Sequence, residues 1–378
     1  MIYFDNSATT AIHPEVLETY RAVSERIMGN PSSLHDLGGE AFRLLDQSRK
    51  QTADLLGVDK QEVFFTSGGT EGDNWAIKGT AFEKLPYGKH LITTAIEHPA
   101  VLETFAQLEK MGFDVTYLPV DRNGVLVPNE VKKAIRKDTV LVSVMAVNNE
   151  TGSIQPIKEV GEILKEFPSI HFHVDAVQAV GRVPIELGEG SRVDVAVFSA
   201  HKFHGPRGTG IVYKKRGRIL APLLNGGGQE YGQRSGTENT AGIAAASKAL
   251  RLHLKDDDKK NRHIYQLKEA LCHYLAEKDR VLLFSPENGA PHILCFGIKG
   301  IKGEVVVHAL EKEKIYTSTT SACSSKQSVH SGTLQAMGLA HEVADTAVRI
   351  SLCFDNTLEE VETFKKVFDG IYRRFERL

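Results

Sequence analysis

The chain has 378 residues, more than a single hydrophobic core usually supports, so we expect one large and one small domain. Its 46 basic and 48 acidic residues leave a formal net charge of −2, which gives no reason to expect nucleic acid or a membrane as a partner. The N-terminal residues lack the pattern of a signal peptide, and the longest strongly apolar stretch, residues 140–147, is too short for a membrane helix.

The first two thirds of the chain alternate between strand patterns and helical patterns. After a short strand and a polar turn within residues 1–13, helices are expected at 14–28 and 39–56, the second ended by Gly57. Strands are expected at 63–66, 91–94, 115–118, 140–147, 170–174, 193–198 and 210–213. Helices are expected between most of them, at 70–82, 99–111, 128–135 and 157–166. This order predicts an α/β fold with a mostly parallel mixed sheet covered on both faces.

The last third of the chain has a different pattern. A helix at 240–254 is followed by a charge run at 255–260, which we interpret as a solvated segment at a domain boundary. The remaining elements are a helix to about 278, a strand at 293–298, a helix at 304–312, a polar loop at 318–331, a strand at 347–352 and a helix at 358–375. We therefore expect a large domain at 14–254 and a small α+β domain at 1–13 and 255–378.

Four cysteines are present, and none forms a C-x-x-C pair, so a reducing compartment such as the cytoplasm is expected. Cys272, Cys295 and Cys353 have apolar surroundings and are expected to be buried thiols. Cys323 stands instead in a polar segment of small residues, where a thiol is expected to be exposed and mobile. It is a candidate nucleophile, with an incidental surface cysteine as the alternative.

Asp175 and Lys202 follow two consecutive predicted strands, at the sheet edge where open α/β sheets bind ligands. An acid and a lysine placed in this way suit a cofactor with a cationic ring nitrogen and an aldehyde. Pyridoxal 5'-phosphate (PLP) is such a cofactor, because a lysine holds it covalently and an acid pairs with its pyridinium nitrogen. The alternative is an ordinary salt bridge with a surface lysine.

Other polar residues are expected at the same edge. The sequence from Ser67 to Glu71 follows a strand and opens a helix, so its backbone N–H groups could hold a phosphate; a plain capped turn is the alternative. His98 could stack on the ring and move protons, or be merely structural. Asn148 and Asn149 end a very apolar strand, which favours a ligand contact. His171 and His173 share one strand face, but with no third ligand evident we expect no metal site there.

Motifs spread over almost the whole chain resemble the cysteine desulfurases of the IscS/NifS-like class, within the fold-type-I PLP-dependent (class-V aminotransferase) family. The long polar segment around Cys323 is similar to this class rather than to the class with a short cysteine segment. The motifs that carry the resemblance lie at residues 5–10, 30–33, 66–71, 97–98, 147–150, 173–178, 199–202, 234–237 and 321–324.

The resemblance implies a role for each matching residue. Lys202 would bind PLP covalently, Asp175 would keep the pyridine nitrogen protonated, His98 would stack on the ring as a catalytic residue, and Gln178 would contact the phenolic oxygen. Asn149 and Arg349 would hold the substrate carboxylate, for which the planar arginine fork is suited. The phosphate would be held by Gly69, Thr70, Ser199 and His201, and by Thr237 of a neighbouring subunit, which implies a homodimer.

The implied activity is that of a transferase converting L-cysteine to L-alanine, with the sulfur held as a persulfide on Cys323. An acceptor protein would then take the sulfur for iron–sulfur cluster assembly or for tRNA or cofactor thiolation. One alternative is another fold-type-I enzyme, such as a selenocysteine lyase or an aminotransferase, although an aminotransferase needs no thiol. A second alternative is a non-catalytic sulfur-relay protein, which the presence of Lys202, Asp175 and Cys323 disfavours.

Overall fold

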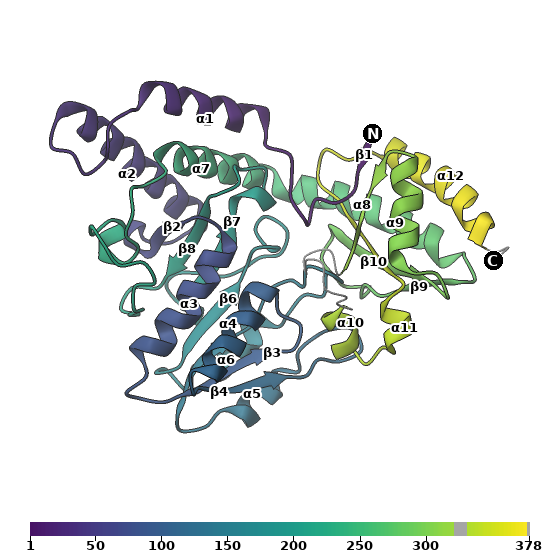
Figure 1. Ribbon diagram of the computed structural model, residues 1–378, viewed down its shortest axis with the longest axis horizontal. Helices are drawn as coiled ribbons and strands as arrows, with labels where there is room; N and C mark the ends of the chain where they lie inside the picture. The colour runs from purple at the N-terminus through teal and green to yellow at the C-terminus, as the bar shows by residue number, and fades with distance from the viewer. Residues whose placement is uncertain (321–330, 376–378) are drawn as a thin grey trace.

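The computed structural model describes residues 1–320 and 331–375. Figure 1 shows two bodies side by side. The larger one contains the main sheet and its helices, and the smaller one contains the N-terminal strand and the last helix, α12. Among the described residues, no helix combines the length and the apolar character needed to span a membrane.

The main sheet has seven strands in the order β2-β8-β7-β6-β5-β3-β4. Only β8 runs antiparallel to its neighbours, so the expected mostly parallel α/β fold is confirmed. The strands are β2 Val63–Thr66, β3 His90–Thr94, β4 Asp114–Leu118, β5 Thr139–Ser143, β6 His171–Asp175, β7 Val195–Ser199 and β8 Gly210–Lys214.

Helices cover both faces of this sheet. Neighbouring strand residues alternate between the faces: Phe64 and Val197 pack with Trp75 of α3, whereas Phe65 and Phe198 belong to the larger cluster beneath α2 and α7. The helices are α1 Pro14–Arg26, α2 Asp36–Leu56, α3 Gly69–Glu83, α4 Pro99–Lys110, α5 Pro128–Ala134, α6 Ile157–Leu164 and α7 Thr240–Leu254, with 3-10 turns η1 Lys60–Glu62, η2 Ala200–Lys202 and η3 Glu230–Gly232.

Local sequence signals set several helix ends. Proline occupies the first position of α1, α4 and α5, where its missing N–H costs nothing. Gly57 ends α2 in the left-handed conformation, with φ of 68°, as predicted. Because these signals are local, the starts of α1 and α4 and the end of α2 lie where the sequence placed them.

The smaller body is built on a four-stranded antiparallel sheet in the order β12-β13-β10-β9. The N-terminal strand β1 pairs with β11, and Phe4 joins a separate hydrophobic cluster with Phe296, Phe364 and Phe368. This separate cluster supports the two-domain division, which we retain as a proposal. The elements are β1 Ile2–Tyr3, α8 Asp257–Ala276, β9 Val281–Leu283, β10 Ile293–Ile298, α9 Gly303–Lys312, β11 Ile315–Tyr316, β12 Ser318–Thr319, α10 Gly332–Ala336, α11 His341–Ala344, β13 Ala347–Ser351 and α12 Leu358–Phe375.

Two expectations about individual segments differ from the structure. The strand expected at 140–147 ends at Ser143, because the chain beyond it turns back so that Val147 bridges Ile154. Cys295 and Cys353 are buried as expected, but the expectation was wrong for Cys272, which is only partly buried at the edge of its cluster. Cys323 lies outside the described residues.

Candidate active site

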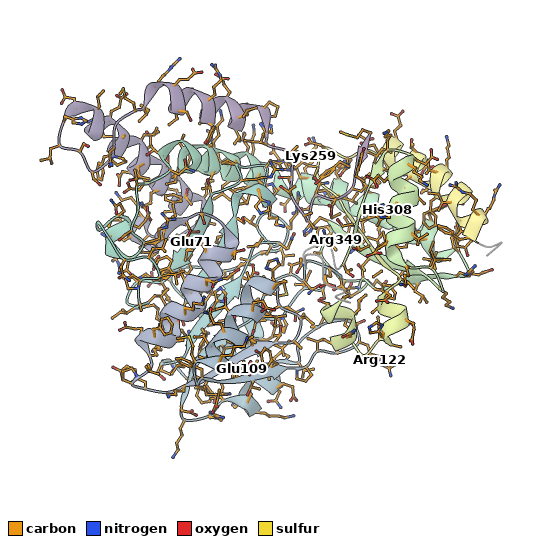
Figure 2. All side chains as sticks on the ribbon, viewed as in Figure 1. Glu71, Glu109, Arg122, Lys259, His308 and Arg349 are labelled. Atoms are coloured by element: carbon orange, nitrogen blue, oxygen red, sulfur yellow. The ribbon has the colours of Figure 1, made fainter. Side chains whose placement is uncertain are left out.

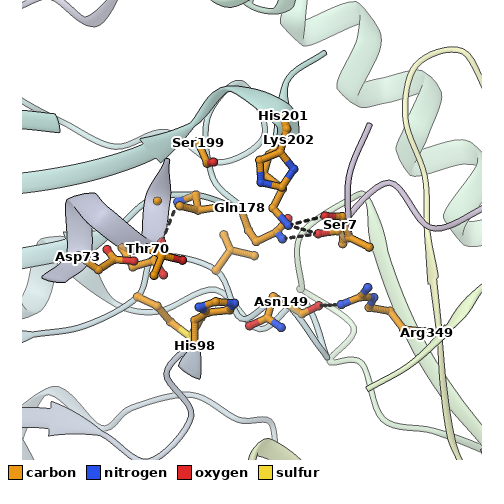
Figure 3. Close-up of a pocket in the computed structure, with 16 residues that line it drawn as sticks. Ser7, Thr70, Asp73, His98, Asn149, Gln178, Ser199, His201, Lys202 and Arg349 are labelled. Atoms are coloured by element: carbon orange, nitrogen blue, oxygen red, sulfur yellow. Dashed lines mark hydrogen bonds between the residues drawn. The ribbon is translucent and has the colours of Figure 1, made fainter. Parts of the chain in front are cut away.

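A cavity of about 250 Å³ opens at the carboxyl edge of the main sheet, where the two bodies meet. Liquid water occupies about 30 Å³ per molecule, so the cavity has room for a small organic ligand. Figure 3 shows its labelled side chains converging from several elements. The lining residues are Ser7, Ala8, Gly69, Thr70, Asp73, His98, Met145, Val147, Asn149, Asp175, Val177, Gln178, Ser199, His201, Lys202 and Arg349.

Lys202 reaches the cavity from η2, directly after β7. Its Nζ atom donates to the backbone oxygens of Ser7 and Ala8, at 2.5 and 3.0 Å. Gln178 also donates to the Ser7 oxygen, at 3.0 Å. The polar turn after β1 therefore holds the lysine amine at the cavity wall (Figure 3).

Asp175 is the last residue of β6 and is buried. One of its carboxylate oxygens accepts the N–H of Val177, at 2.9 Å. Burial raises the pKa of Asp175 to about 7, and the carboxylate of Asp73 on α3 adds to this effect. Burial also raises the pKa of Asp73 well above its ordinary value. The charges of His173 and Lys202 lower the pKa of Asp175 only in part, so a positively charged group bound beside these buried acids would be favourable.

A neighbouring wall of the cavity suits an anion. Helix α3 begins at Gly69 with no side-chain cap, so its first N–H groups point at the cavity wall formed by Thr70 and Ser199. A Cβ atom on Gly69 would lie 3.0 Å from the Val177 side chain and 3.5 Å from Ser199 Cβ. Glycine thus preserves a small cradle at the helix N-terminus.

His98 caps α4, and its Nδ1 accepts the N–H of Ala100 at 3.1 Å. Burial lowers the pKa of His98 to about 4, and the nearby charge of Lys202 contributes. The ring is therefore neutral near pH 7, with its proton on Nε2. Its neighbour Glu97 is a buried carboxyl group whose pKa burial raises to about 8.

Arg349 on β13 approaches the cavity from the smaller body and is fully buried. Figure 2 places it near the centre of the molecule, between the two bodies. Its guanidinium donates to the backbone oxygen of Asn149 at 2.8 Å and to the Asp5 carboxylate at 3.0 Å. Its Nε–H is buried without a partner among the described residues, and the side chain lines the cavity, where a planar guanidinium suits a ligand carboxylate.

The structure gathers most, but not all, of the predicted site residues around one cavity. Thr237 is exposed and does not line the cavity of its own chain, and Cys323 lies outside the described residues. His171 contacts the Thr80 hydroxyl at 3.2 Å, whereas His173 contacts the Ser143 hydroxyl at 2.8 Å and the Asp73 carboxyl group at 3.3 Å.

Several lining residues were missed by the sequence reasoning. Ser7 and Ala8 contribute backbone oxygens, which no side-chain motif announces. Asp73 could have been predicted from the sequence, because it lies three residues after Thr70 and so shares that face of α3. Met145, Val147 and Val177 supply apolar walls and could not be separated from ordinary core residues.

The residues present fit PLP. The buried acids suit the ring nitrogen, the uncapped N-terminus of α3 suits the phosphate, and Lys202 supplies the amine that the aldehyde requires. All three of these features lie around the same cavity.

Comparisons with known proteins agree with this chemistry. Residues 2–364 match the family described as "Aminotransferase class-V". The chain is 56% identical to a "NifS/IcsS protein homolog" of Lactobacillus delbrueckii subsp. bulgaricus, with 100% of the chain and 99% of the relative covered. It is 43% identical to "Cysteine desulfurase IscS" of Methanosarcina thermophila, with 100% and 93% covered. A solved "NIFS-LIKE PROTEIN" superposes with a TM-score of 0.93 at 41% identity, covering 98% of this chain and 99% of that one.

The fold and the site therefore define a PLP-dependent enzyme of the class-V aminotransferase family. Within that family the chain belongs with the IscS/NifS-like cysteine desulfurases.

Proposed function

We propose that the enzyme converts L-cysteine to L-alanine and stores the sulfur on Cys323. In the net reaction the Cys323 thiol and the substrate thiol become a persulfide, while the substrate carbon that loses sulfur gains hydrogen. No external oxidant or reductant is needed, because the transferred sulfur is oxidised from the thiol to the sulfane level while the carbon that loses it is reduced to a methyl group. The full-length similarity to cysteine desulfurases supports this assignment.

The cofactor would be held by the residues that line the cavity. Asp175 would pair with the ring nitrogen and Gln178 would face the phenolic oxygen, while His98 would stack on the ring. Gly69, Thr70, Ser199 and His201 would hold the phosphate. When bound, PLP supplies an electron sink for a carbanion at the substrate Cα.

Proton transfer at the substrate is assigned to Lys202. The hydrogen bond from Ala100 occupies the lone pair of His98 Nδ1, and Nε2 already carries the proton, so the neutral ring has no basic nitrogen facing the cavity. His98 would instead donate a hydrogen bond or a proton through Nε2. The amine of Lys202, once released from the cofactor, is the base that the cavity offers.

Arg349 and Asn149 would bind the substrate carboxylate. The guanidinium of Arg349 and the side chain of Asn149 both line this part of the cavity, and both are suited to a carboxylate. This contact would fix the orientation of the amino acid and would reject substrates without an α-carboxylate.

Contacts of the described residues on either side of the Cys323 segment support the proposal that Cys323 is the nucleophile. Before it, the hydroxyl of Ser318 donates to Asp5, the partner of Arg349, at 2.8 Å. After it, the hydroxyl of Ser331 hydrogen-bonds with Glu150, the neighbour of Asn149. Both ends of the segment are thus tied to the proposed substrate-carboxylate site, which supports delivery of the Cys323 thiol to the substrate sulfur.

The later steps also remain proposals. A persulfide must lose its sulfur before the next turnover, so we propose an acceptor protein, either an iron–sulfur cluster scaffold or a tRNA- or cofactor-thiolating enzyme, in the cytoplasm. A selenocysteine lyase is the nearest alternative, because selenocysteine carries the same carboxylate and amine. We also propose a homodimer in which Thr237 contacts the phosphate in the neighbouring subunit.

The nucleophile is tested by comparing Cys323→Ser with the control Cys272→Ser during turnover of L-cysteine. We expect Cys323→Ser to form alanine at least about 100-fold more slowly and to give no persulfide on its residue-323 peptide by mass spectrometry. The control should retain both properties. Alanine formation at the full rate by Cys323→Ser would contradict the proposal.

A further inference from the structure

A second group of reactive side chains lies apart from the lining of the active-site cavity. His204 follows η2, two residues after Lys202, and Cys353 and Asp355 follow strand β13. Their ligand atoms all lie within 4.8 Å of one another. We propose that these three residues bind a divalent transition-metal ion of the zinc type, a function beyond the proposed desulfurase activity.

The ligand set selects the class of metal. One imidazole nitrogen, one thiolate and one carboxylate are the mixture that borderline-soft Zn²⁺ accepts, with bonds of about 2.0–2.3 Å. Tetrahedral geometry at those bond lengths needs ligand separations of about 3.5 Å. The ligand atoms must therefore move closer by at most about 1.3 Å, and Asp355 is the exposed member of the group.

The orientation of His204 is already suited to a metal. Its Nδ1 lies 3.0 Å from the backbone oxygen of Ala11, to which it can only donate, so the ring proton is on Nδ1. The lone pair is then on Nε2, which is buried and has no hydrogen-bond partner among the described residues. The ring itself is 4% exposed. A buried basic nitrogen without a partner is costly unless a ligand uses it.

Cys353 can supply a thiolate despite its burial. Burial raises the pKa of this thiol to about 11 and the charge of the Asp355 carboxylate adds to this effect, while backbone N–H groups of Asp355 and Asn356 and the charge of Arg182 act in the opposite direction. These donors would remain in place around a metal-bound sulfur. The thiolate and the Asp355 carboxylate together balance the two positive charges of the ion, and Arg182 becomes their outer partner.

The site would connect segments that are distant in sequence. The N–H of His204 donates to the Thr10 hydroxyl at 2.8 Å, and its backbone oxygen accepts the N–H of His13 at 3.0 Å. A bound metal would therefore fasten the turn after Lys202, the N-terminal segment and the segment after β13 to one another. Stabilisation follows from mass action, because the separated segments of the unfolded chain bind the ion less well.

The test is a Co²⁺ titration of the untagged, full-length Cys323→Ser protein, so that the proposed catalytic thiol cannot contribute. We expect one Co²⁺ per chain, with the visible d–d bands of a tetrahedral site and a thiolate charge-transfer band. Added Zn²⁺ should abolish these bands and raise the melting temperature. Absence of a one-to-one site in this correctly folded protein would overturn the proposal.

Two further variants, each made in the Cys323→Ser background, assign the ligands. Adding Cys353→Ser should weaken Co²⁺ binding by at least about 100-fold, and adding the exposed Asp355→Asn should weaken it by about 10-fold. Adding Cys272→Ser, which removes a partly buried thiol elsewhere, should leave binding unchanged. Tight binding that persists with Asp355→Asn and Cys353→Ser, or that is lost only with Cys272→Ser, would also overturn the assignment.

Discussion

The carboxyl group of Asp175 is buried, and the charge of Asp73 raises its pKa further, while His173 and Lys202 lower it only in part. In the cofactor-free chain this arrangement favours the neutral acid. A bound pyridinium ring would place a cation directly beside this carboxyl group. In the cofactor-free chain, ionising the buried carboxyl group costs folding stability.

This cost predicts a pH dependence of stability. The pKa of Asp175 is raised in the folded state to about 7, so the unfolded chain loses its proton first as pH rises. The stability contributed by the neutral acid is fully present below about pH 4 and is lost as pH rises through about 7. Each unit by which the folded-state pKa exceeds the unfolded-state pKa corresponds to about 1.4 kcal/mol of this loss. Cofactor-free Asp175→Asn should therefore become increasingly more stable than the cofactor-free wild type over this range. Melting temperatures measured at several pH values check this. A difference between the two proteins that stays the same at every pH would contradict the assignment.

Asp5 offers a second residue-scale prediction. It orients Arg349 through a 3.0 Å ion pair and accepts the hydroxyl of Ser318 through its other oxygen. Asp5→Asn removes the charge-assisted contact, so we expect KM for L-cysteine to rise by about 10-fold while kcat changes less. Steady-state kinetics measure this split. Asp369→Asn, which removes a carboxylate paired with Lys278, is the matched control, and an equal effect in both variants would contradict a positioning role.

At the scale of secondary-structure elements, helix α3 contributes several groups to the candidate active site. Its N-terminus faces the cavity, and its buried face supplies Asp73 and packs Trp75 against β2. The strand-then-glycine pattern was sufficient to predict this helix, because a helix start depends on local backbone geometry; the anion site at its N-terminus stays a prediction.

The cradle at Gly69 predicts a selective loss of cofactor affinity. Gly69→Ala adds a methyl group 3.0 Å from the Val177 side chain and 3.5 Å from Ser199 Cβ, so the helix N-terminus must shift relative to the residues that would hold the phosphate. We expect PLP binding to weaken by about 10-fold, measured by titrating cofactor-free protein, with little change in melting temperature. Gly370→Ala, in α12 with nothing within 4 Å of the added Cβ, is the control. Unchanged affinity for Gly69→Ala would argue against the phosphate assignment.

Sequence patterns failed for the short elements. Strands β9 and β11 and helices α10 and α11 have two to five residues each, too few for a hydrophobic period to appear. Long elements such as α7, β10 and α12 have the predicted bounds, because each has enough residues to show its buried face. Tertiary pairing, rather than local preference, decides the short ones.

At the scale of the whole molecule, the chain closes the site by returning its N-terminal segment to the sheet edge. Asp5, Ser7 and Ala8 meet Arg349 and Lys202 there, although hundreds of residues separate them in some cases. The sequence predicted Lys202 and Asp175 from strand ends, but it could not predict contacts made by backbone oxygens of a distant turn. The His204–Cys353–Asp355 group escaped prediction for the same reason.

A homodimer is the prediction at this scale. Large apolar side chains are exposed on α2 and on the loop before it, including Met28 at 82%, Leu34 at 105% and Phe42 at 55%. Such a patch typically marks an interface. Light scattering should give a dimer for the wild type and a monomer for Leu34→Glu combined with Phe42→Glu. Leu358→Glu, at an exposed leucine of α12, should remain dimeric, and a monomeric wild type would contradict the prediction.

The central claim is that the amine of Lys202 holds PLP at the sheet edge. Borohydride reduction of the purified enzyme, followed by digestion and peptide mass spectrometry, tests it directly. The account predicts a phosphopyridoxyl group on the peptide containing Lys202, and none on any peptide of Lys202→Ala. A label on a different lysine of the active enzyme, with Lys202 unmodified, would contradict the account.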